Sequence, residues 1–107
     1  MEPGVFSRNV LALAKAIPWG RVTTYAEIAR AAGNPRAARA AGNALNKNLR
    51  PIHVPCHRVV RSDGRIGGYL LGVRKKIRLL EKEGIEVRRG RVADFAKRRF
   101  RFREKAI

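Results

Sequence analysis

Acidic residues, cysteine and glutamine are scarce in this sequence of 107 residues. Eight Asp and Glu stand against 25 Lys and Arg, giving a formal net charge of +17 at pH 7. Such an excess of one sign is costly through self-repulsion, and it is typical of proteins that bind an anionic partner such as DNA, RNA or an anionic membrane. Glutamine is absent and arginine is abundant, which favours a thermophilic source, where residues prone to deamidation are rare.

Long apolar runs are also missing. No stretch of about 18 apolar residues is present, and the N-terminus lacks the basic-then-apolar pattern of an export signal. We therefore expect a cytoplasmic protein with no membrane partner. The single cysteine, Cys56, cannot form an internal disulfide and is either an inert buried thiol or a reactive one. One cysteine and two histidines are too few for the usual zinc sites, so we expect no metal and no cofactor.

The chain length suits one compact domain, residues 1–107, because two cores would leave each half too short to offset its ordering entropy. Apolar residues at spacings of three and four predict an amphipathic helix over residues 5–16. Pro18 follows that helix. Thr24 and Glu27 have the spacing of a capping box, which predicts a second helix that ends at Gly33.

A third helix is predicted from Asn34 and Pro35 to about Asn46, because Asn suits an N-cap and Pro suits the first helical position. Two helices joined by a tight glycine turn are typical of a helix-turn-helix, although many helical hairpins bind no nucleic acid. The charge of +17 favours the DNA-binding interpretation. We expect a mainly α fold with very short strands, a winged-helix-like helix-turn-helix domain.

The second half of the chain is rich in turn signals. Residues 52–60 are interpreted as two very short extended pieces around a turn, and residues 62–64 as another turn. Gly67 and Gly68 indicate backbone that adopts positive φ or passes close to another group. A helix from Val73 is predicted to end at Gly84. The basic extension, residues 85–107, is expected to form a final helix packed by its phenylalanines.

The segment Pro55, Cys56, His57 and Arg58 sets a thiol, an imidazole and a guanidinium side by side behind a rigid proline. An unperturbed thiol is only about 3% thiolate at neutral pH, so a nucleophilic role requires a base or a positive field, and cationic neighbours lower the thiol pKa. Adjacent side chains of an extended backbone point to opposite faces, so a direct hydrogen bond from Cys56 to His57 is not expected. The local chemistry alone does not decide between a structural and a catalytic cysteine.

Four blocks of sequence, in this order and spacing, resemble one family. They are IPWGRVTTY (residues 17–25), GNPRAARAAG (33–42), IHVPCHRVV (52–60), and GGY followed by LLEKEG (67–84). Together they resemble the C-terminal catalytic domain of the O6-alkylguanine-DNA alkyltransferases, also called methylated-DNA–protein-cysteine methyltransferases. The resemblance covers residues 17–84, and the family's usual N-terminal domain has no counterpart here.

The resemblance implies a role for five residues in chemistry. Cys56 matches the alkyl acceptor, and His57 matches the base that draws its proton through a water. Glu83 matches the carboxylate that orients this imidazole, and Asn48 the asparagine that fixes the turn beside the acceptor. Tyr25 matches the tyrosine that donates to guanine N3 as the alkyl group leaves, which suits a reaction that expels a guanine anion.

Other matched positions imply contacts with DNA. Arg39 matches the arginine that enters the base stack when the target nucleotide rotates out, a step that the chemistry requires because a base inside a duplex is out of reach. The small residues around it suit a helix that enters the minor groove; the DNA-binding set is Arg36, Ala37, Ala38, Arg39 and Tyr25. The expected substrate pocket is walled by Tyr69, Val59, Leu70 and Leu71, and the last two should narrow it against benzyl-sized adducts.

The resemblance implies a single-turnover DNA-repair enzyme that transfers the alkyl group of O6-alkylguanine irreversibly to its own Cys56. Its expected partner is double-stranded DNA, and a monomer is expected. The alternative is a non-catalytic, alkyltransferase-like lesion sensor that binds O6-alkylguanine and recruits other repair proteins; such proteins lack the acceptor cysteine. A helix-turn-helix binder without lesion preference would leave the Pro-Cys-His-Arg segment unexplained.

Overall fold

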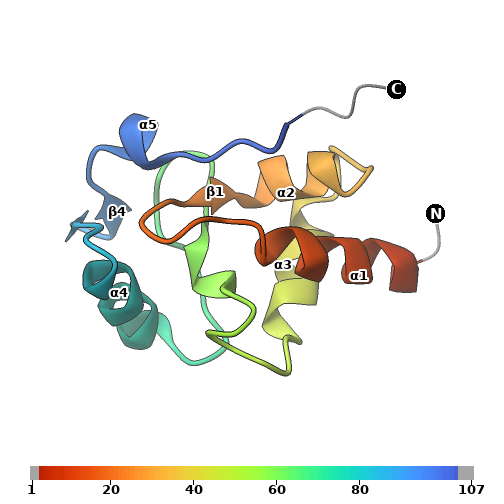
Figure 1. Ribbon diagram of the computed structural model, residues 1–107, viewed down its shortest axis with the longest axis horizontal. Helices are drawn as coiled ribbons and strands as arrows, with labels where there is room; N and C mark the ends of the chain where they lie inside the picture. Colours follow the sequence, from red (N-terminus) through yellow and green to blue (C-terminus); the bar gives the residue numbers. More distant parts are fainter. Residues whose placement is uncertain (1–2, 104–107) are drawn as a thin grey trace.

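The computed structural model describes residues 3–103 and is mainly helical (Figure 1). Its elements, in chain order, are α1 (Pro3–Ala14), β1 (Thr23–Thr24), α2 (Tyr25–Ala31), α3 (Ala38–Asn46), the 3-10 helix η1 (Cys56–Arg58), β2 (Val59–Val60), α4 (Val73–Lys82), β3 (Val87–Arg88), β4 (Arg91–Val92) and α5 (Phe95–Arg98). The expected class, mainly α with very short strands, is confirmed. Within residues 3–103, no helix is long and apolar enough to cross a membrane. Residues 104–107 of the expected basic extension lie outside the described part.

Helices α1, α2 and α3 form the N-terminal half, where α2 and α3 make the predicted helix-turn-helix. The Thr24 hydroxyl accepts a hydrogen bond from Glu27 N at 3.0 Å, as expected of an N-cap. The capping box is only half formed, because the Glu27 carboxylate accepts instead from Arg30 and from Phe102 N. Gly33 has φ 104° and turns the chain after α2, which only glycine does at little cost.

The third helix begins later than expected. Asn34 does not cap it: Asn34 Oδ1 accepts from Arg36 N at 3.2 Å, and Asn34 O accepts from Ala37 N at 3.0 Å. These bonds close a turn over residues 34–37, because the asparagine side chain satisfies the backbone two residues ahead. Helix α3 therefore starts at Ala38, although its end at Asn46 agrees with the prediction.

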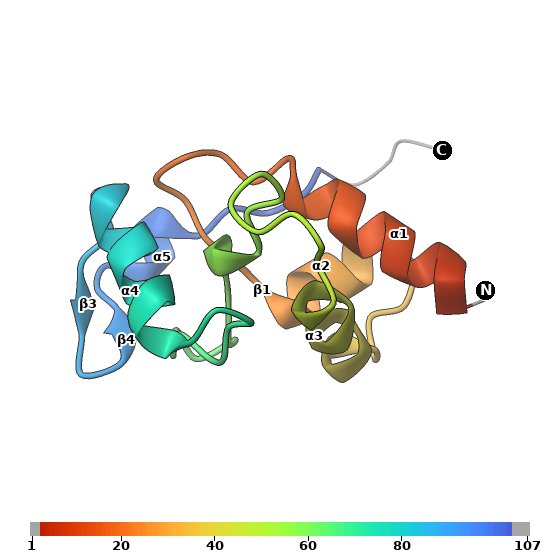
Figure 2. The ribbon, with the colours of Figure 1, turned by 90° about the horizontal axis from the view of Figure 1, so that it is seen from below.

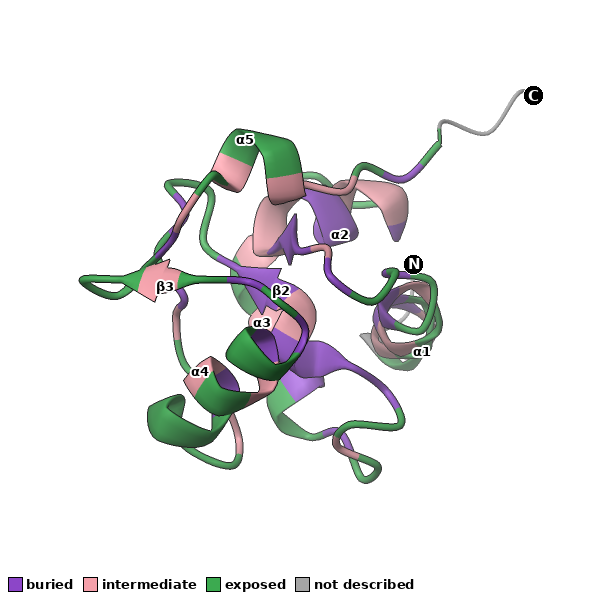
Figure 3. Cartoon of the chain, turned by 60° about the vertical axis from the view of Figure 1, so that its left-hand side comes forward, coloured by how far each residue is buried: buried purple, intermediate pink, exposed green. Residues whose placement is uncertain are grey.

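Three short extended segments lie side by side in the middle of the molecule. Strand β1 pairs in parallel with β2, with Thr23 opposite Val59, and Val22 forms an isolated parallel bridge with Arg99 on its other side. Val22 N donates to Arg98 O at 2.9 Å, so the C-terminal segment completes this small layer. Figure 3 shows that β2 and the adjoining backbone are buried between the helices, whereas α4 presents a mostly exposed outer surface.

Two expectations for the second half of the chain are wrong in part or in full. Of the two extended pieces expected around a turn in residues 52–60, only Val59–Val60 is a strand, whereas residues 52–53 form a turn. The turn between them is the 3-10 turn of residues 56–58, in which Arg58 N donates to Pro55 O and Val59 N to Cys56 O. The basic extension is not one helix: it forms the β3–β4 hairpin, the four-residue α5 and an extended end. Positive φ at Arg89, Gly90 and Asp94 breaks any continuous helix there.

The core has two parts. The larger cluster joins α1, α2 and α3 to η1 and to Phe102 from the C-terminal end, and the smaller lies between the middle layer, α4 and the β3–β4 hairpin. Phe102 is buried and Phe100 packs against the same cluster. The phenylalanines therefore anchor the C-terminal segment as expected, although from extended backbone rather than from a helix.

Candidate active site and DNA-facing hollow

The Cys56 thiol sits at the start of η1, held from one side by a buried asparagine. Asn48 Nδ2 donates to Val54 O at 2.9 Å and to Cys56 Sγ at 3.4 Å, while Asn48 Oδ1 accepts from Arg50 N at 2.9 Å. Asn48 thus ties the loop of residues 48–54 to the cysteine. Cys56 itself is only 4% exposed.

His57, Glu83 and Arg58 form a buried network beside the thiol. His57 Nε2 lies 2.7 Å from Glu83 Oε2, and the Arg58 guanidinium donates to both oxygens of the same carboxylate at 2.8–3.1 Å. Gly20 N adds a further bond to Glu83 Oε1 at 3.0 Å. Arg58 also donates to Ile17 O and lies against the Trp19 ring, at 5.7 Å from its centroid. The carboxylate is therefore held by two segments far apart in sequence, the turn at Gly20 and the 3-10 helix η1.

The electrostatics of this network favour a neutral imidazole beside an ionised carboxylate. Burial lowers the pKa of His57 despite the opposing Glu83. Burial would raise the pKa of Glu83, but hydrogen bonds from Arg58, His57 and Gly20 hold it below its usual value. Nε2–H therefore donates to Glu83, and Nδ1 is left as the acceptor. His57 Nδ1 is buried and has no hydrogen-bond partner within residues 3–103, so no direct bond joins it to Cys56.

The thiol pKa differs from the expectation that cationic neighbours would lower it. Burial raises the pKa of Cys56, and the opposing Asn48 amide and Lys76 charge do not overcome that effect. In the free protein Cys56 is consequently a protonated thiol at neutral pH. Any reaction at this sulfur requires a base, and the free Nδ1 of His57 is the nearby group of suitable chemistry.

A buried lysine, Lys76, holds the backbone of residues 59 and 66–68 near Tyr25. Lys76, from α4, is 0% exposed, and its ammonium donates to the carbonyls of Val59, Ile66 and Gly68 and, at 3.4 Å, to the Tyr25 hydroxyl. Burial lowers the pKa of Lys76 to about 7. The ammonium thereby pins the glycine turn of residues 66–68 to the start of α2.

Tyr25 lies close enough to Cys56 to be affected by its charge, and it also lines an open hollow. Burial, followed by the nearby Cys56, raises the pKa of Tyr25 to about 12, so the phenol stays protonated and its hydroxyl remains a donor. A Cβ on Gly67 would lie 3.2 Å from this hydroxyl, and Gly67 has φ 70°. The prediction of a glycine needed for close approach and positive φ is confirmed at Gly67.

A hollow of about 460 Å³ opens between α3 and this glycine turn. It is lined by side chains and backbone of Tyr25, Ala38, Arg39, Gly42, Asn43, Asn46, Arg61, Gly67 and Gly68. Arg39 is exposed at its rim, and a Cβ added at Gly42 would lie 3.7 Å from the Tyr25 ring. The volume of this hollow, which is open to solvent, is sufficient for a group the size of a purine.

The other residues singled out from the sequence lie around this centre. Arg36 is exposed, and Ala37 and Ala38 are half-buried at the start of α3. Four residues expected to wall the pocket are absent from the lining of the hollow: Val59 is fully buried in β2, Tyr69 meets the His57 ring edge-on at 6.4 Å, Leu70 packs on the main core, and Leu71 is 45% exposed. The expected narrowing of a pocket beside Cys56 by Leu70 and Leu71 stays a prediction, since Cys56 does not line the hollow.

The sequence did not predict the hydrogen-bonding roles of two charged residues of the site, Arg58 and Lys76. Arg58 was considered as a cationic neighbour of Cys56, whereas it clamps the Glu83 carboxylate. Lys76 was missed, although Leu80, a core residue of α4, lies four residues after Lys76 and three after Ile77. A lysine at a core position of an amphipathic helix was the available signal. Within residues 3–103 no cluster of three or more His, Cys, Asp or Glu is arranged to hold a metal ion.

Comparison with known proteins relates the chain to a DNA-binding domain. Residues 5–85 match the family described as "6-O-methylguanine DNA methyltransferase, DNA binding domain". A methylated-DNA–protein-cysteine methyltransferase of Methanothermobacter thermautotrophicus is 49% identical over 83 residues, which are 77% of this chain and 46% of that protein. The chain thus spans less than half the length of this relative.

Solved structures with similar folds include complexes with DNA. S. pombe Atl1 bound to damaged DNA containing O6-carboxymethylguanine superposes with a TM-score of 0.84 at 32% identity, covering 94% of this chain and 99% of that one. Mycobacterium tuberculosis OGT in complex with DNA gives 0.72 at 43% identity, covering 74% and 48% respectively. The chain therefore belongs to the family that carries the 6-O-methylguanine DNA methyltransferase DNA-binding domain.

Proposed function

We propose that the protein repairs duplex DNA by moving the alkyl group of O6-alkylguanine onto Cys56. The sulfur attacks the alkyl carbon, a C–S bond forms and the bond from that carbon to guanine O6 breaks. The thiol proton passes to His57 by way of a water, and the departing guanine takes a proton at N3 from the Tyr25 hydroxyl. The imidazolium of His57 then gives its proton through solvent to the Tyr25 phenolate, so that the proton lost by sulfur balances the one gained by the base and both side chains recover their starting states. Because the thioether is stable, each molecule acts once.

The observation that carries this proposal is the arrangement of Asn48, Cys56, His57 and Glu83. A buried carboxylate fixes the imidazole tautomer and leaves Nδ1 as a free base on the residue that follows the protonated thiol of Cys56. The Asn48 amide can stabilise the thiolate as it forms. A purely structural cysteine requires none of these groups, whereas nucleophilic catalysis requires an adjacent base and a third group that orients it.

The hollow beside α3 supplies the second half of the proposal. A target base must leave the stack to bring its alkyl group to the buried Cys56 thiol, and the hollow can receive it next to Tyr25. Arg39 at the rim would fill the gap left in the stack, with Arg36, Ala37 and Ala38 against the backbone of the minor groove. Cys56 does not line the hollow, so side chains at its inner wall move when the base enters. On this proposal residues 1–107 form a single catalytic and DNA-binding domain of a transferase, with the family resemblance over residues 17–84, and the protein acts as a monomer.

The second candidate function is lesion sensing without transfer. It is favoured by one observation, the likeness over 99% of the Atl1 chain that was solved with damaged DNA. A sensor needs the hollow and Arg39 but does not need a base beside a thiol. The presence of Cys56 with its network therefore favours transfer.

The two candidates differ in one product. The protein is incubated with duplex DNA containing a single O6-methylguanine, and the tryptic peptide bearing Cys56 is weighed. A transferase gains one methyl group at Cys56 per molecule and restores guanine, while a Cys56→Ser variant binds the same duplex without gaining mass. Binding by the wild-type protein with an unmodified Cys56 peptide would reject transfer and leave the sensor.

A further inference from the structure

Arginines gather on the β3–β4 hairpin and on the loop beside it. The segments 61–65 and 86–91 hold five arginines and two acidic residues. Asp63 lies at the centre of this group: the Arg65 backbone N–H lowers its pKa, with further contributions from the charges of Arg65, Arg61 and Arg91. Arg89 and Arg91 are exposed and make no ion pair within residues 3–103. We call Arg61, Arg65, Arg89 and Arg91 the hairpin cluster.

The hairpin is fastened to the rim of the hollow. Ile66 N donates to Gly90 O at 3.0 Å, Val92 N donates to Gly64 O at 2.9 Å, and Arg65 forms an antiparallel bridge with Arg91. Ile66 is followed directly by Gly67 and Gly68, which line the hollow together with Arg61. Figure 2 shows the hairpin turn, this loop and α3 along one side of the molecule, with α1 on the opposite side.

We propose that the hairpin cluster is a second DNA-binding surface, which grips the phosphates of the duplex next to the rotated nucleotide and works as a basic wing beside α3. The inference rests on the proposed function, because it takes the hollow as the place of the target base. The hairpin lies beyond residue 85, where the match to the family domain ends. Unpaired guanidinium groups on a tight turn are suited to phosphate, which they bind in a bidentate manner. Continuity with the hollow makes DNA the partner, since the same duplex must pass both.

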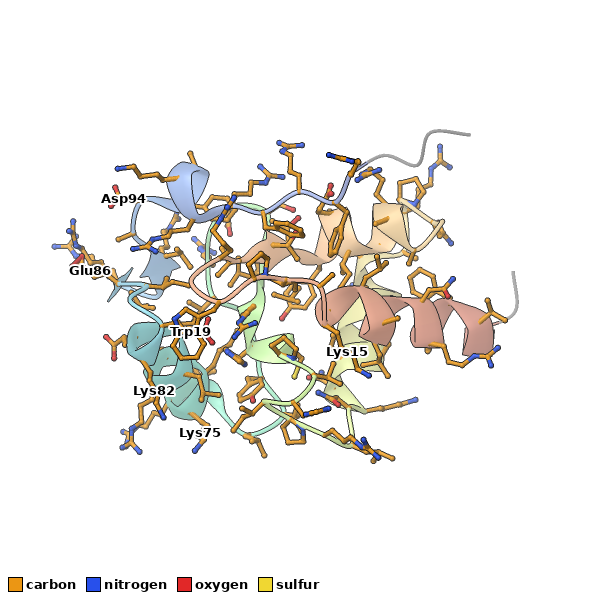
Figure 4. All side chains as sticks on the ribbon, viewed as in Figure 1. Lys15, Trp19, Lys75, Lys82, Glu86 and Asp94 are labelled. Carbon is orange, nitrogen blue, oxygen red and sulfur yellow. The ribbon has the colours of Figure 1, made fainter. Side chains whose placement is uncertain are left out.

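The test compares two double variants that remove the same charge. Arg89→Asn with Arg91→Gln removes the tip of the cluster, and Asn suits residue 89 because its φ of 51° is tolerated by asparagine. Arg8→Gln with Lys15→Gln is the matched control, because Arg8 on α1 and Lys15 directly after α1 are both exposed. Figure 4 shows that Lys15 lies far from Glu86, which belongs to the hairpin segment. Affinity for a duplex with one O6-methylguanine is measured by fluorescence anisotropy from 50 to 400 mM salt, on a Cys56→Ser background. Transfer rates at saturating DNA are measured with Cys56 present.

For each phosphate that the hairpin variant no longer neutralises, its affinity at 0.1 M salt should fall about eightfold, and its log–log salt slope should become shallower by about 0.9. Its transfer rate at saturating DNA should equal that of the wild type, and the α1 control should match the wild type in slope. Equal slopes for the two double variants would overturn the proposal while leaving DNA binding and transfer intact. If the wild-type protein itself showed no salt-dependent binding and no methylated Cys56, the proposed function would fail and the wing with it.

Discussion

Replacing Glu83 by glutamine tests how much the buried network of His57, Arg58 and Glu83 contributes to stability, because Glu83 accepts all of the hydrogen bonds that join it. The Glu83 carboxylate is 3% exposed and accepts from His57, from the Arg58 fork and from Gly20 N. Glutamine keeps the shape but removes the charge, and one of its terminal groups becomes a donor that faces donors. Arg58, whose side chain is 13% exposed, is left as a largely buried cation without its counter-ion.

The cost follows from that uncompensated charge. Removing one partner of a buried ion pair destabilises proteins by roughly 3–5 kcal/mol, and the hydrogen bonds that glutamine retains place this variant near the lower value. With an m-value of about 2 kcal/mol/M for a small domain, the urea midpoint should fall by about 1.5 M. Alkyl transfer should also slow, because the imidazole loses the group that fixes its tautomer.

Equilibrium urea unfolding followed by circular dichroism measures the effect. Glu81→Gln is the control, since Glu81 is exposed on α4 only two residues away. Adding Arg58→Met to Glu83→Gln should recover part of the lost stability, because the unpaired cation is then absent. A Glu83→Gln variant that unfolds within about 1 kcal/mol of the Glu81→Gln control would refute the reasoning, since it would lie far below the expected cost of breaking a buried pair.

Three further predictions concern the surroundings of the thiol. Gly67→Ala should lower the free energy of unfolding more than Gly84→Ala does. Both positions have positive φ, which costs about 1–3 kcal/mol for most residues, but only at Gly67 does the new Cβ meet Tyr25. Equal losses of stability in calorimetric unfolding of the two variants would show that the contact with Tyr25 does not matter. Asn48→Ala should raise the pKa of Cys56, because a donor to the sulfur is removed, and the pH midpoint of iodoacetamide alkylation should rise relative to wild type and to Asn9→Ala, which alters an exposed residue on α1. The pKa of His57 lies below its usual value in the folded protein, so the unfolded chain takes up a proton first, and the free energy of unfolding should fall as pH drops below about 6.5. The exposed His53→Gln variant is the control and should show the same pH dependence as the wild type. If His57→Gln showed it too, His57 would be excluded as the source of the pH dependence.

The helices were predictable because their patterns are local. Thr24 as an N-cap, Gly33 as a stop and the apolar spacing of the first helix all act within a few residues. The start of α3 was misplaced because Asn34 can satisfy either a helix start or its own turn, and the two alternatives look alike in sequence. Glu27 shows the same limit, since its partner Phe102 lies 75 residues away.

The site was predictable only through the resemblance. Spacing alone gives no reason for Glu83 to meet His57 across 26 residues, or for Arg58 to join them. The sign of the thiol pKa shift was wrong because sequence neighbours revealed the cations but not the burial, which is the larger effect at Cys56. The hairpin cluster was invisible for a similar reason, since tertiary pairing brings residue 65 against residue 91.

The measurement that tests the central claim most directly is the structure of the Cys56→Ser variant bound to a duplex containing O6-methylguanine. We predict that the damaged base lies outside the stack, in the hollow between α3 and the Gly67 turn, with its methyl group toward residue 56 and with Arg39 in the vacated position. A damaged base still stacked in the duplex, or one whose methyl group points to solvent, would contradict this prediction.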